Sequence, residues 1–317
     1  MDAPNVLLTN REKPICNVPE VRIGNKPIDG GNYLFTPQEK TEFIAKEPLS
    51  ARWFRRWIGA DEFINGYERW CLWLGNCPPN ELRQMPEALK RVEAVRQLRL
   101  ASKSIPTQKI AATPTRFHVE NIPDSPYLVI PEVSSERRIF VPIGFMQPDT
   151  LSSNLVKIVP NATLYHFGIL TSTMHNAWMR TVCGRLESRY RYSVGIVYNN
   201  FPWPEIPPSS PLAKGEGAQR GGIPAIETAA QAVLDARALF PGSTLADLYD
   251  PLSMPPELVR AHQNLDRAVD AAYGKKSFVS EAERVAFLFE RYQALTSLLP
   301  AAETKKTEKR ARETTKP

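Results

Sequence analysis

The sequence predicts an α+β fold, in which a β-rich part with flanking helices is followed by a small all-α part. Between residues 115 and 170, short runs of β-branched and aromatic residues alternate with prolines, a pattern that is typical of strands. After residue 224, apolar residues instead recur at the spacing of amphipathic helices. The stretch 202–224, rich in proline and glycine, separates the two parts.

The first hundred residues are expected to contain few regular elements. Residues 29–32 hold two adjacent glycines and predict a turn. A buried strand is expected at 68–74, and a helix at 86–103, because proline is favoured in the first turn of a helix. Three basic residues share one face of that helix: Arg96, Arg99 and Lys103. We favour a solvated face for them over contacts with phosphate groups.

The later elements follow from composition and from capping residues. Strands are expected at 127–131, 138–145, 163–170 and 195–199. Ser172 or Thr173 can cap a helix that runs to Cys183 and closes at Gly184. In the all-α part, helices are expected at about 226–239, from 255 to just before Gly274, and after a capping box formed by Ser280 and Glu283.

Composition excludes several classes of protein. The 317 residues suffice for about two domains, and 42% hydrophobic residues support a sizeable core. The net charge of +6 is a mild basic bias, compatible with nucleic acid as a partner. No signal peptide and no apolar run of the ~18 residues that a membrane span needs is present. Cys16, Cys71, Cys77 and Cys183 fit no zinc or disulfide pattern, so we expect free thiols in a reducing cytoplasm.

The stretch 185–192, Arg-Leu-Glu-Ser-Arg-Tyr-Arg-Tyr, has the most informative pattern in the chain. In one extended strand, the charged residues would share one face, and the other four residues could anchor against a core. The charged residues are Arg185, Glu187, Arg189 and Arg191. Arginine can donate two hydrogen bonds to guanine, and glutamate can accept one from the cytosine amino group, so the row suits the major groove of DNA. An exposed strand with an internal salt bridge explains the pattern equally well.

A second charged cluster lies between two expected strands and consists of Ser134, Ser135, Glu136, Arg137 and Arg138. It is either a hairpin loop with its own salt bridge or a loop that places arginines on bases or phosphates. Lys157 and the basic helix could add further phosphate contacts.

Several segments match a known family in their order of residues as well as in composition. They are 54–66 (Phe-Arg-Arg-Trp-Ile-Gly-Ala-Asp-Glu-Phe-Ile-Asn-Gly), 127–138 (Tyr-Leu-Val-Ile-Pro-Glu-Val-Ser-Ser-Glu-Arg-Arg), 165–175, and 178–186 with 198–204. These segments resemble the recognition region of MmeI-like DNA methyltransferases, and the resemblance covers most of residues 1–300.

The resemblance implies a domain organisation. Residues 1–205 would be a DNA target-recognition domain, with 1–50 as the lead-in from an upstream catalytic domain. A flexible linker at 206–223, a helical C-terminal domain at 224–300 and a disordered basic tail at 301–317 would follow. The implied partners are double-stranded DNA and the methyltransferase domain of the same bacterial, cytoplasmic polypeptide, which would bind S-adenosylmethionine and methylate adenine N6.

The resemblance also assigns roles to the two charged clusters. In the family, the residues that read bases lie at charged positions of the recognition domain. Arg137 and Arg138 match one group of such positions in the motif, and Glu187, Arg189 and Arg191 match the other. Ser135, Glu136, Lys157 and Arg185 complete the predicted DNA-binding set.

The chain itself is not expected to transfer methyl groups, and we expect no catalytic residue, cofactor or metal site in it. The glycine-rich segment 215–222 follows a polyproline stretch, whereas a cofactor loop follows a strand. In 76–80, Asn-Cys-Pro-Pro-Asn, a cysteine interrupts the Asn-Pro-Pro-aromatic motif of adenine-N6 methyltransferases and no aromatic residue follows, so we expect a turn. Three alternatives stay open: a protein-interaction module without DNA binding, an enzyme of another type, and a binder of single strands or RNA.

Overall fold

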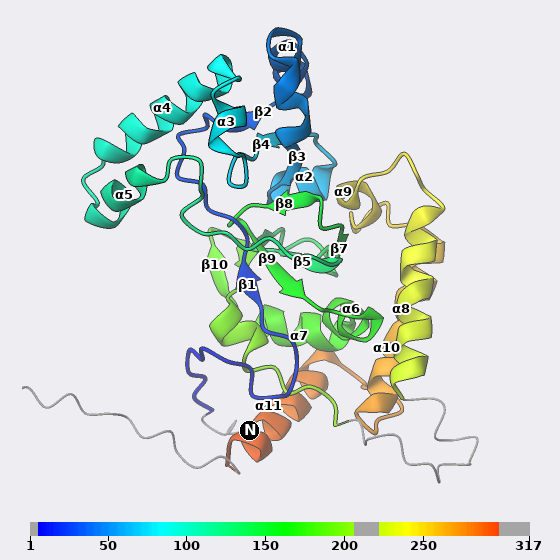
Figure 1. Cartoon of the computed structure of the whole chain (residues 1–317). Coiled ribbons are helices and arrows are strands. Elements are labelled where there is room, and N and C mark those ends of the chain that lie inside the picture. The colour runs from blue at the N-terminus through cyan, green and yellow to red at the C-terminus, as the bar shows by residue number, and fades with distance from the viewer. Residues whose placement is uncertain (1–5, 206–221, 298–317) are drawn as a thin grey trace, which may run out of the picture.

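The computed structural model describes residues 6–205 and 222–297, and its architecture is α+β, as the sequence predicts (Figure 1). Strands lie in the first of these ranges, and the second range is helical. Most of the predicted linker (206–221) and the predicted tail (301–317) lie outside the described residues. None of the described helices is both long and apolar enough to span a lipid bilayer.

Two four-stranded sheets form the centre of the β-rich part. The first has the order β1 (Arg22–Ile23), β9 (Val156–Pro160), β5 (Tyr127–Pro131), β7 (Gly144–Met146), and its pairs are all antiparallel. The second has the order β2 (Leu34–Phe35), β4 (Trp70–Leu72), β3 (Phe54–Ile58), β8 (Thr150–Ser152), with β3 and β8 parallel. Since β8 and β9 are consecutive, the turn at 153–155 carries the chain from one sheet to the other.

A third, three-stranded sheet has the order β10 (Gly184–Leu186), β11 (Arg189–Arg191), β6 (Val133–Ser134). The helices before it are α1 (Pro37–Lys46), α2 (Ala60–Asn65), α3 (Pro79–Leu82), α4 (Pro86–Leu100), α5 (Ile105–Lys109), α6 (Leu164–Thr171) and α7 (Thr173–Val182). After residue 222 come α8 (Ile223–Ala238), α9 (Leu245–Leu248), α10 (Pro256–Ala272) and α11 (Glu281–Ser297). Short 3₁₀ turns at Pro48–Trp53 and Ile110–Ala112 and a π-helical turn at Val194–Tyr198 complete the list.

The two parts of the chain share one hydrophobic core. Buried residues of β5, α6 and α7 belong to the same apolar cluster as buried residues of α8, α10 and α11. Gly168 of α6 allows α8 to approach closely, because a Cβ atom at this position would lie only 2.8 Å from Ile226. Asp266 of α10 also accepts a 2.7 Å hydrogen bond from the backbone N–H of Thr173, at the first turn of α7. The C-terminal helices are therefore an integral part of the core of the β-rich part.

The described part of the region expected as a lead-in, 6–50, contributes strands to both four-stranded sheets. It supplies β1, β2 and α1. The helix α1 was not predicted, although Thr36 and Glu39 form a capping box at its start, with Thr36 N–H donating to Glu39 Oε2 at 2.7 Å. The Thr-Pro-Gln-Glu sequence at 36–39 contains this motif and could have revealed the helix.

Most predicted elements are confirmed, with bounds that differ from the predicted ones by a few residues. Strand β5 has the predicted bounds, and β4 lies inside the predicted strand 68–74. Helices α4, α7, α8, α10 and α11 occupy the predicted segments, and Ser172 caps α7 as expected. The glycine-containing turn at 29–32 is also present, with Gly30 and Gly31 at φ 61° and 82°. All four cysteines are free thiols.

Two predicted strands are wrong because tertiary contacts override local preference. Residues 163–170 form α6, whose first turn is closed by Thr163 N–H donating to His166 Nδ1 at 3.0 Å. Its residues 167–171 are all buried, so an apolar run without polar alternation fits a buried helix as well as a strand. Residues 195–199 form most of a π-helical turn, in which Asn199 N–H donates to the carbonyl of Val194.

The predicted strand 138–145 is present only at its end, as β7. Pro142 cannot donate a hydrogen bond to a neighbouring strand. The N–H of Val141 donates instead to Asn176 Oδ1 of α7, at 2.9 Å. The segment 138–143 therefore crosses α7 as an irregular chain.

The solvated face predicted for the helix at 86–103 is confirmed for Arg96 of α4 and for Lys103, which lies beyond the end of α4, since both are exposed. It is wrong for Arg99, which is fully buried. The guanidinium group of Arg99 donates five hydrogen bonds of 2.8–3.1 Å to backbone carbonyls. The acceptors are Pro27, Ile28, Ile110, Thr113 and Arg116. Arg99 therefore fastens two irregular segments onto α4.

Replacing Arg99 with methionine should destabilise the protein strongly. The change keeps most of the side-chain volume but leaves five buried carbonyl groups without their donor, so we expect the free energy of unfolding to fall by about 3 kcal/mol. Arg96→Met on the same helix removes only an exposed pair with Glu93 and should cost less than about 0.5 kcal/mol. Urea unfolding measures both changes, and equal losses for the two variants would contradict the structural role of Arg99.

Candidate functional site

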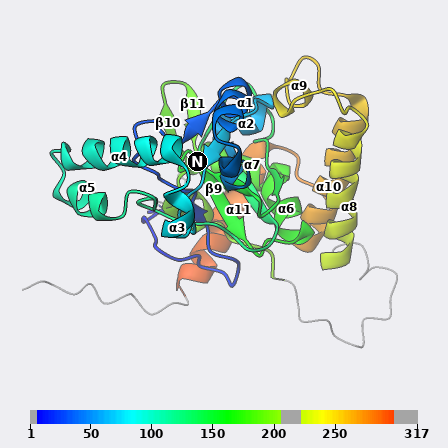
Figure 2. The same cartoon turned by 45° about the horizontal axis from the view of Figure 1, so that its top comes forward.

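The charged stretch 185–192 is a hairpin in the structure, and the prediction of one continuous strand is wrong (Figure 2). Strands β10 and β11 are joined by a tight turn at Glu187 and Ser188, where Glu187 adopts a left-handed conformation with φ 57°. The turn lets Arg189 form a 2.9 Å ion pair with Glu187 at the surface.

The hairpin changes which residues share a face. Directly opposed residues of antiparallel strands project to the same side, so Arg185 lies with Tyr190, and Leu186 lies with Arg189. Arg191 is two residues from Arg189 and so projects to the same side as Arg189. Arg185 does not join this row: its guanidinium group lies 4.0 Å from the centre of the Tyr190 ring.

The predicted anchoring of the stretch against a core is confirmed for its two tyrosines. Tyr190 is 9% and Tyr192 is 3% exposed, and both belong to the large apolar core. The hydroxyl of Tyr192 lies 2.9 Å from Nε2 of His175 in α7. Burial lowers the pKa of His175 to about 3, so this histidine is neutral and the contact is a hydrogen bond between neutral groups. Leu186 and Ser188, expected on the anchored face, are exposed.

Strand β6 brings the second charged cluster beside the hairpin. Tyr190 pairs with Ser134, and Arg191 pairs with Val133. Because the strands are antiparallel, the chain that leaves β6 heads toward the hairpin turn, and 135–138 forms a turn of its own there. Two clusters about fifty residues apart in sequence thus lie in one surface structure. We name β6, β10, β11 and the flanking residues 132 and 135–138 the charged sheet.

The residues of the second cluster differ in exposure. Glu136 and Arg137 are exposed, and Ser135 is half-buried, with its hydroxyl oxygen accepting a 3.3 Å hydrogen bond from Arg137 N–H. Arg138 is also half-buried. Burial lowers the pKa of its guanidinium group, and the nearby carboxylate of Asp250 acts in the opposite direction. Arg138 therefore lies toward the C-terminal helices.

Glu132 is the residue of this site that sequence analysis missed. Its Oε1 accepts a 3.0 Å hydrogen bond from Arg191, and its Oε2 accepts a 2.7 Å hydrogen bond from Lys157. Burial of the carboxylate raises its pKa, but the hydrogen bonds and charges of Lys157 and Arg191 outweigh this effect and place the pKa below the ordinary value. The pattern Glu-Val-Ser-Ser-Glu at 132–136 did not distinguish this glutamate from its exposed neighbour Glu136.

Lys157 is placed differently from a surface phosphate ligand. It lies in the middle of β9, only 8% exposed, and its amino group is bound to Glu132. Its position next to Arg191 through the shared carboxylate makes it part of the support beneath the charged sheet.

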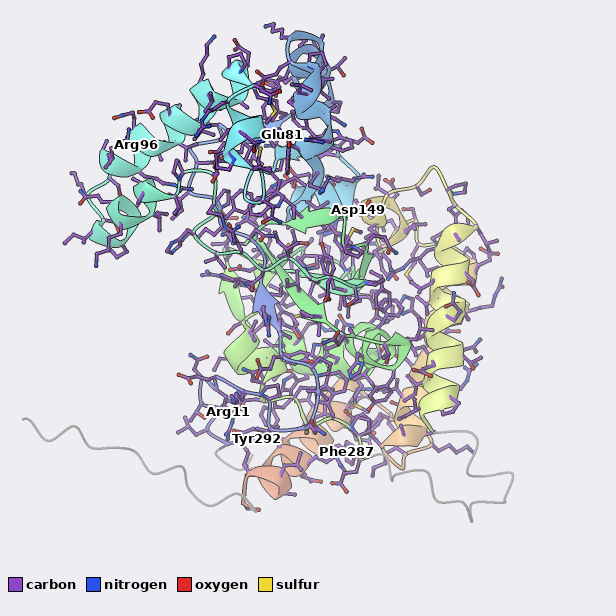
Figure 3. The ribbon with its side chains drawn as sticks, in the orientation of Figure 1. Arg11, Glu81, Arg96, Asp149, Phe287 and Tyr292 are labelled. Atoms are coloured by element: carbon purple, nitrogen blue, oxygen red, sulfur yellow. The ribbon has the colours of Figure 1, made fainter. Side chains whose placement is uncertain are left out.

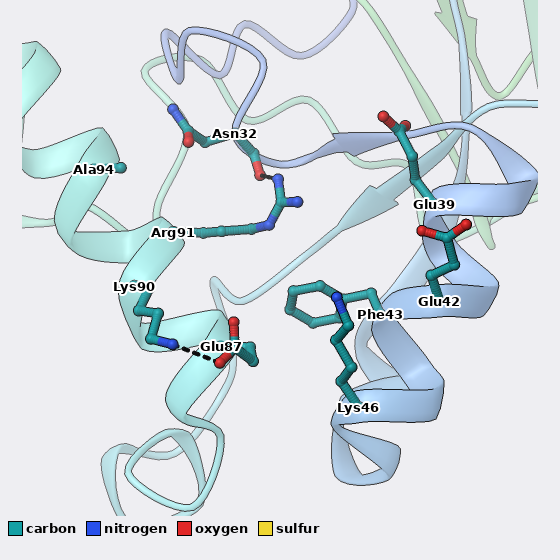
Figure 4. A pocket seen from close by; sticks show the side chains of 9 residues that line it. All are labelled: Asn32, Glu39, Glu42, Phe43, Lys46, Glu87, Lys90, Arg91 and Ala94. Carbon is teal, nitrogen blue, oxygen red and sulfur yellow. Dashed lines mark hydrogen bonds and ion pairs between the residues drawn. The ribbon is translucent and has the colours of Figure 1, made fainter.

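A separate cleft of about 360 Å³ lies between α1 and α4, far along the chain from the charged sheet (Figure 4). Its lining mixes acidic and basic side chains that mostly serve the two helices. Glu39 caps α1, Glu87 pairs with Lys90 at 2.6 Å, and Arg91 donates to the carbonyl of Asn32 at 2.7 Å. In the described residues, no three His, Cys, Asp or Glu side chains lie close enough together to share a metal ion.

Comparisons with known proteins show which family has this architecture. Residues 2–205 match the family described as the MmeI target recognition domain, and residues 219–300 match the one described as the MmeI C-terminal domain. DNA methyltransferase A of Bacillus subtilis (strain 168) is 40% identical over 295 residues, which are 93% of this chain and 32% of that protein.

A solved structure of the type IIL restriction-modification enzyme MmeI in complex with DNA is similar in fold, with a TM-score of 0.87 and 49% identity. The similarity covers 94% of this chain and 38% of the MmeI chain. The chain thus spans well under half the length of either relative. Because the two family matches together cover nearly all of the described residues, the chain belongs to the MmeI family and comprises its target-recognition and C-terminal domains.

Proposed function

We propose that this chain is the sequence-recognition part of a DNA methyltransferase of a restriction-modification system, and that its charged sheet reads base edges in the major groove. The pairing of β6 with β11 is the observation that supports this most, because it gathers both charged clusters on one exposed sheet. The buried tyrosines hold the backbone of that sheet against the core. The MmeI structure that resembles this chain was solved with DNA.

Within this surface we assign roles by chemistry and exposure. Arg189 and Arg191 project to one side and can each donate two hydrogen bonds to guanine, while Glu187 can accept from the cytosine amino group. Arg137 is exposed beside them, and Glu136, Ser135 and Arg138 complete the loop. Lys157 is buried, and Arg185 projects to the side of Tyr190 and away from Arg189 and Arg191, so we assign these two residues to support of the surface.

The remaining parts of the proposal concern the longer polypeptide. A methyltransferase domain of the same chain would bind S-adenosylmethionine and methylate N6 of an adenine that is flipped out of the duplex, in the bacterial cytoplasm. The relative named DNA methyltransferase A, of which this chain covers 32%, supports a further domain of this kind. The present chain would contribute the choice of site.

A protein-interaction module without affinity for DNA is the alternative. It predicts that the arginines of the charged sheet are an ordinary solvated surface. The two functions are distinguished by DNA binding at low salt, since phosphate contacts make DNA affinity fall steeply as the salt concentration rises.

Replacing Arg189 and Arg191 together with glutamine should relax sequence preference. Each arginine that reads a guanine contributes about 1–3 kcal/mol of discrimination against the wrong base, so preference should weaken at the affected base pairs. Selection of bound duplexes from a random library, followed by titration at 50 to 200 mM salt, measures this. Arg260→Gln with Arg267→Gln on α10 is the matched control, because both are exposed arginines away from the sheet. An unaltered preference in the Arg189/Arg191 variant would contradict the assignment, and no DNA binding by the unmodified chain would favour the interaction module.

Replacing Glu132 with glutamine should destabilise the charged sheet in a pH-dependent way. The folded protein holds the pKa of Glu132 below its ordinary value, so the stabilisation is present above the unfolded pKa of about 4.3. It is lost as pH falls through the folded pKa. The melting temperature of Glu132→Gln should therefore lie below that of the unmodified chain at pH 7, and the difference should shrink below about pH 4.

Glu136→Gln is the control for this experiment, because Glu136 is exposed and makes no ion pair within the described parts of the chain. Its melting temperature should match that of the unmodified protein at both pH values. A Glu132→Gln difference that persists unchanged at low pH would show that the lost charge is not the cause.

A further inference from the structure

We propose that α4, α5 and the chain that follows them to residue 116, here named the α4–α5 arm, form a second DNA-binding surface that contacts phosphates of the duplex beside the charged sheet. This inference rests on the proposed function, because it needs a duplex on the charged sheet. It adds a sequence-independent contact to the base-reading one.

The charge of the arm is one-sided. Between Glu93 and Glu120 the sequence has no acidic residue, while it has five basic ones: Arg96, Arg99, Lys103, Lys109 and Arg116. Arg96 and Arg116 pair with the two glutamates that bound this stretch, and Arg99 is buried. Lys103 and Lys109 are exposed and have no hydrogen bond or ion pair in the described parts of the chain. Two positive charges are thus left for an external anion.

The polar residues around the lysines also suit a phosphate backbone. The stretch 102–108 contains the hydroxyl residues Ser102, Ser104 and Thr107, whereas the side-chain amide of Gln108 donates to the carbonyl of Ser102 at 2.7 Å. Hydroxyl side chains next to lysine are common donors to phosphate oxygens. The stretch carries no acidic side chain that would repel a phosphate. Its lysine and hydroxyl groups are of the kind that contact the DNA backbone irrespective of sequence.

The arm is held rigidly, which favours binding. Arg99 joins the carbonyls of Pro27 and Ile28 on one side to those of Ile110, Thr113 and Arg116 on the other. Because the backbone that bears Lys103 and Lys109 is fastened to α4 through these bonds, less conformational entropy is lost when the lysines meet their partner.

The arm lies on the same side of the molecule as the base-reading hairpin. Both views show α4 and α5 extending from the body on the side where β10 lies (Figures 1 and 2). Arg96 marks the outer part of α4, clear of the sheets (Figure 3). A duplex bound to the charged sheet extends beyond it in both directions, so the arm can meet the backbone on one flank of the recognition site.

Exposed apolar residues also occur on the arm: Leu98, Leu100 and Ile105 are 39%, 46% and 65% exposed. A protein partner would use them. The lack of acidic residues between Glu93 and Glu120, and two lysines without an ion pair among the described residues, favour a polyanion, and DNA is the polyanion that the charged sheet would bring there.

The test compares Lys103→Gln with Lys109→Gln against a matched pair, Lys275→Gln with Lys276→Gln, on the exposed connection between α10 and α11. Both double variants of the whole chain lose two positive charges. Fluorescence anisotropy with a random-sequence duplex at 50 to 200 mM salt gives the slope of log affinity against log salt. We expect the arm variant to lose about 2 from the magnitude of this slope, at roughly 0.9 per phosphate contact, and the control to lose none.

Base preference, from selection of duplexes, should be unchanged in the arm variant, and its melting temperature should equal that of the unmodified chain. An arm variant with the unmodified slope would overturn the inference while leaving the proposed function intact, and would leave the exposed leucines as a protein contact. Equal losses in both variants would also overturn it, because net charge alone would then explain the effect. If the unmodified chain binds no DNA, the proposed function and this inference both fail.

Discussion

The candidate site depends on the alternation of tyrosine and arginine in β11 and the residue that follows it. Tyr190 and Tyr192 face the core, and this fixes Arg189 and Arg191 on the opposite side. The Tyr192 hydroxyl, bound to a neutral histidine of α7, and the pairing of Tyr190 with β6 prevent a shift of the strand by one residue. Such a shift would send both arginines inward and both tyrosines outward. The position of every charged side chain on the sheet follows from this register.

Polar contacts then set how mobile each arginine is. Arg191 forms an ion pair with Glu132, which also pairs with the buried Lys157. The guanidinium group of Arg191 is therefore anchored to the core of the domain. Among the described residues, Arg189 forms an ion pair with Glu187 alone, on a turn that is itself exposed, and an exposed pair of this kind costs little to break. The two arginines share a face but differ in preorganisation, which suits one for a fixed contact and the other for an adaptable one.

The sequence predicted the fold class, the four longest of the described helices together with α7, and the two charged clusters, because these depend on local patterns. Proline and capping residues marked α4, α7, α10 and α11, and apolar β-branched residues marked β5. What it could not show depends on partners distant in the chain. The hairpin at Glu187 needs a left-handed residue that the sequence does not mark with glycine or asparagine, and α6 is a helix because of what buries it. The roles of Glu132 and Arg99 come from carbonyls, lysines and arginines brought from other segments, so neither could be separated from exposed neighbours of the same type.

The shared core has a consequence for the modular history of such proteins. Family descriptions separate the recognition and C-terminal segments, yet α6 and α8 meet at Gly168 with no room for a side chain between them, and α10 supplies the acceptor that starts α7. Recombination between relatives that joined one recognition segment to another protein's C-terminal helices would have to match these contacts across the joint. Inheritance of the two segments as a single unit avoids that requirement.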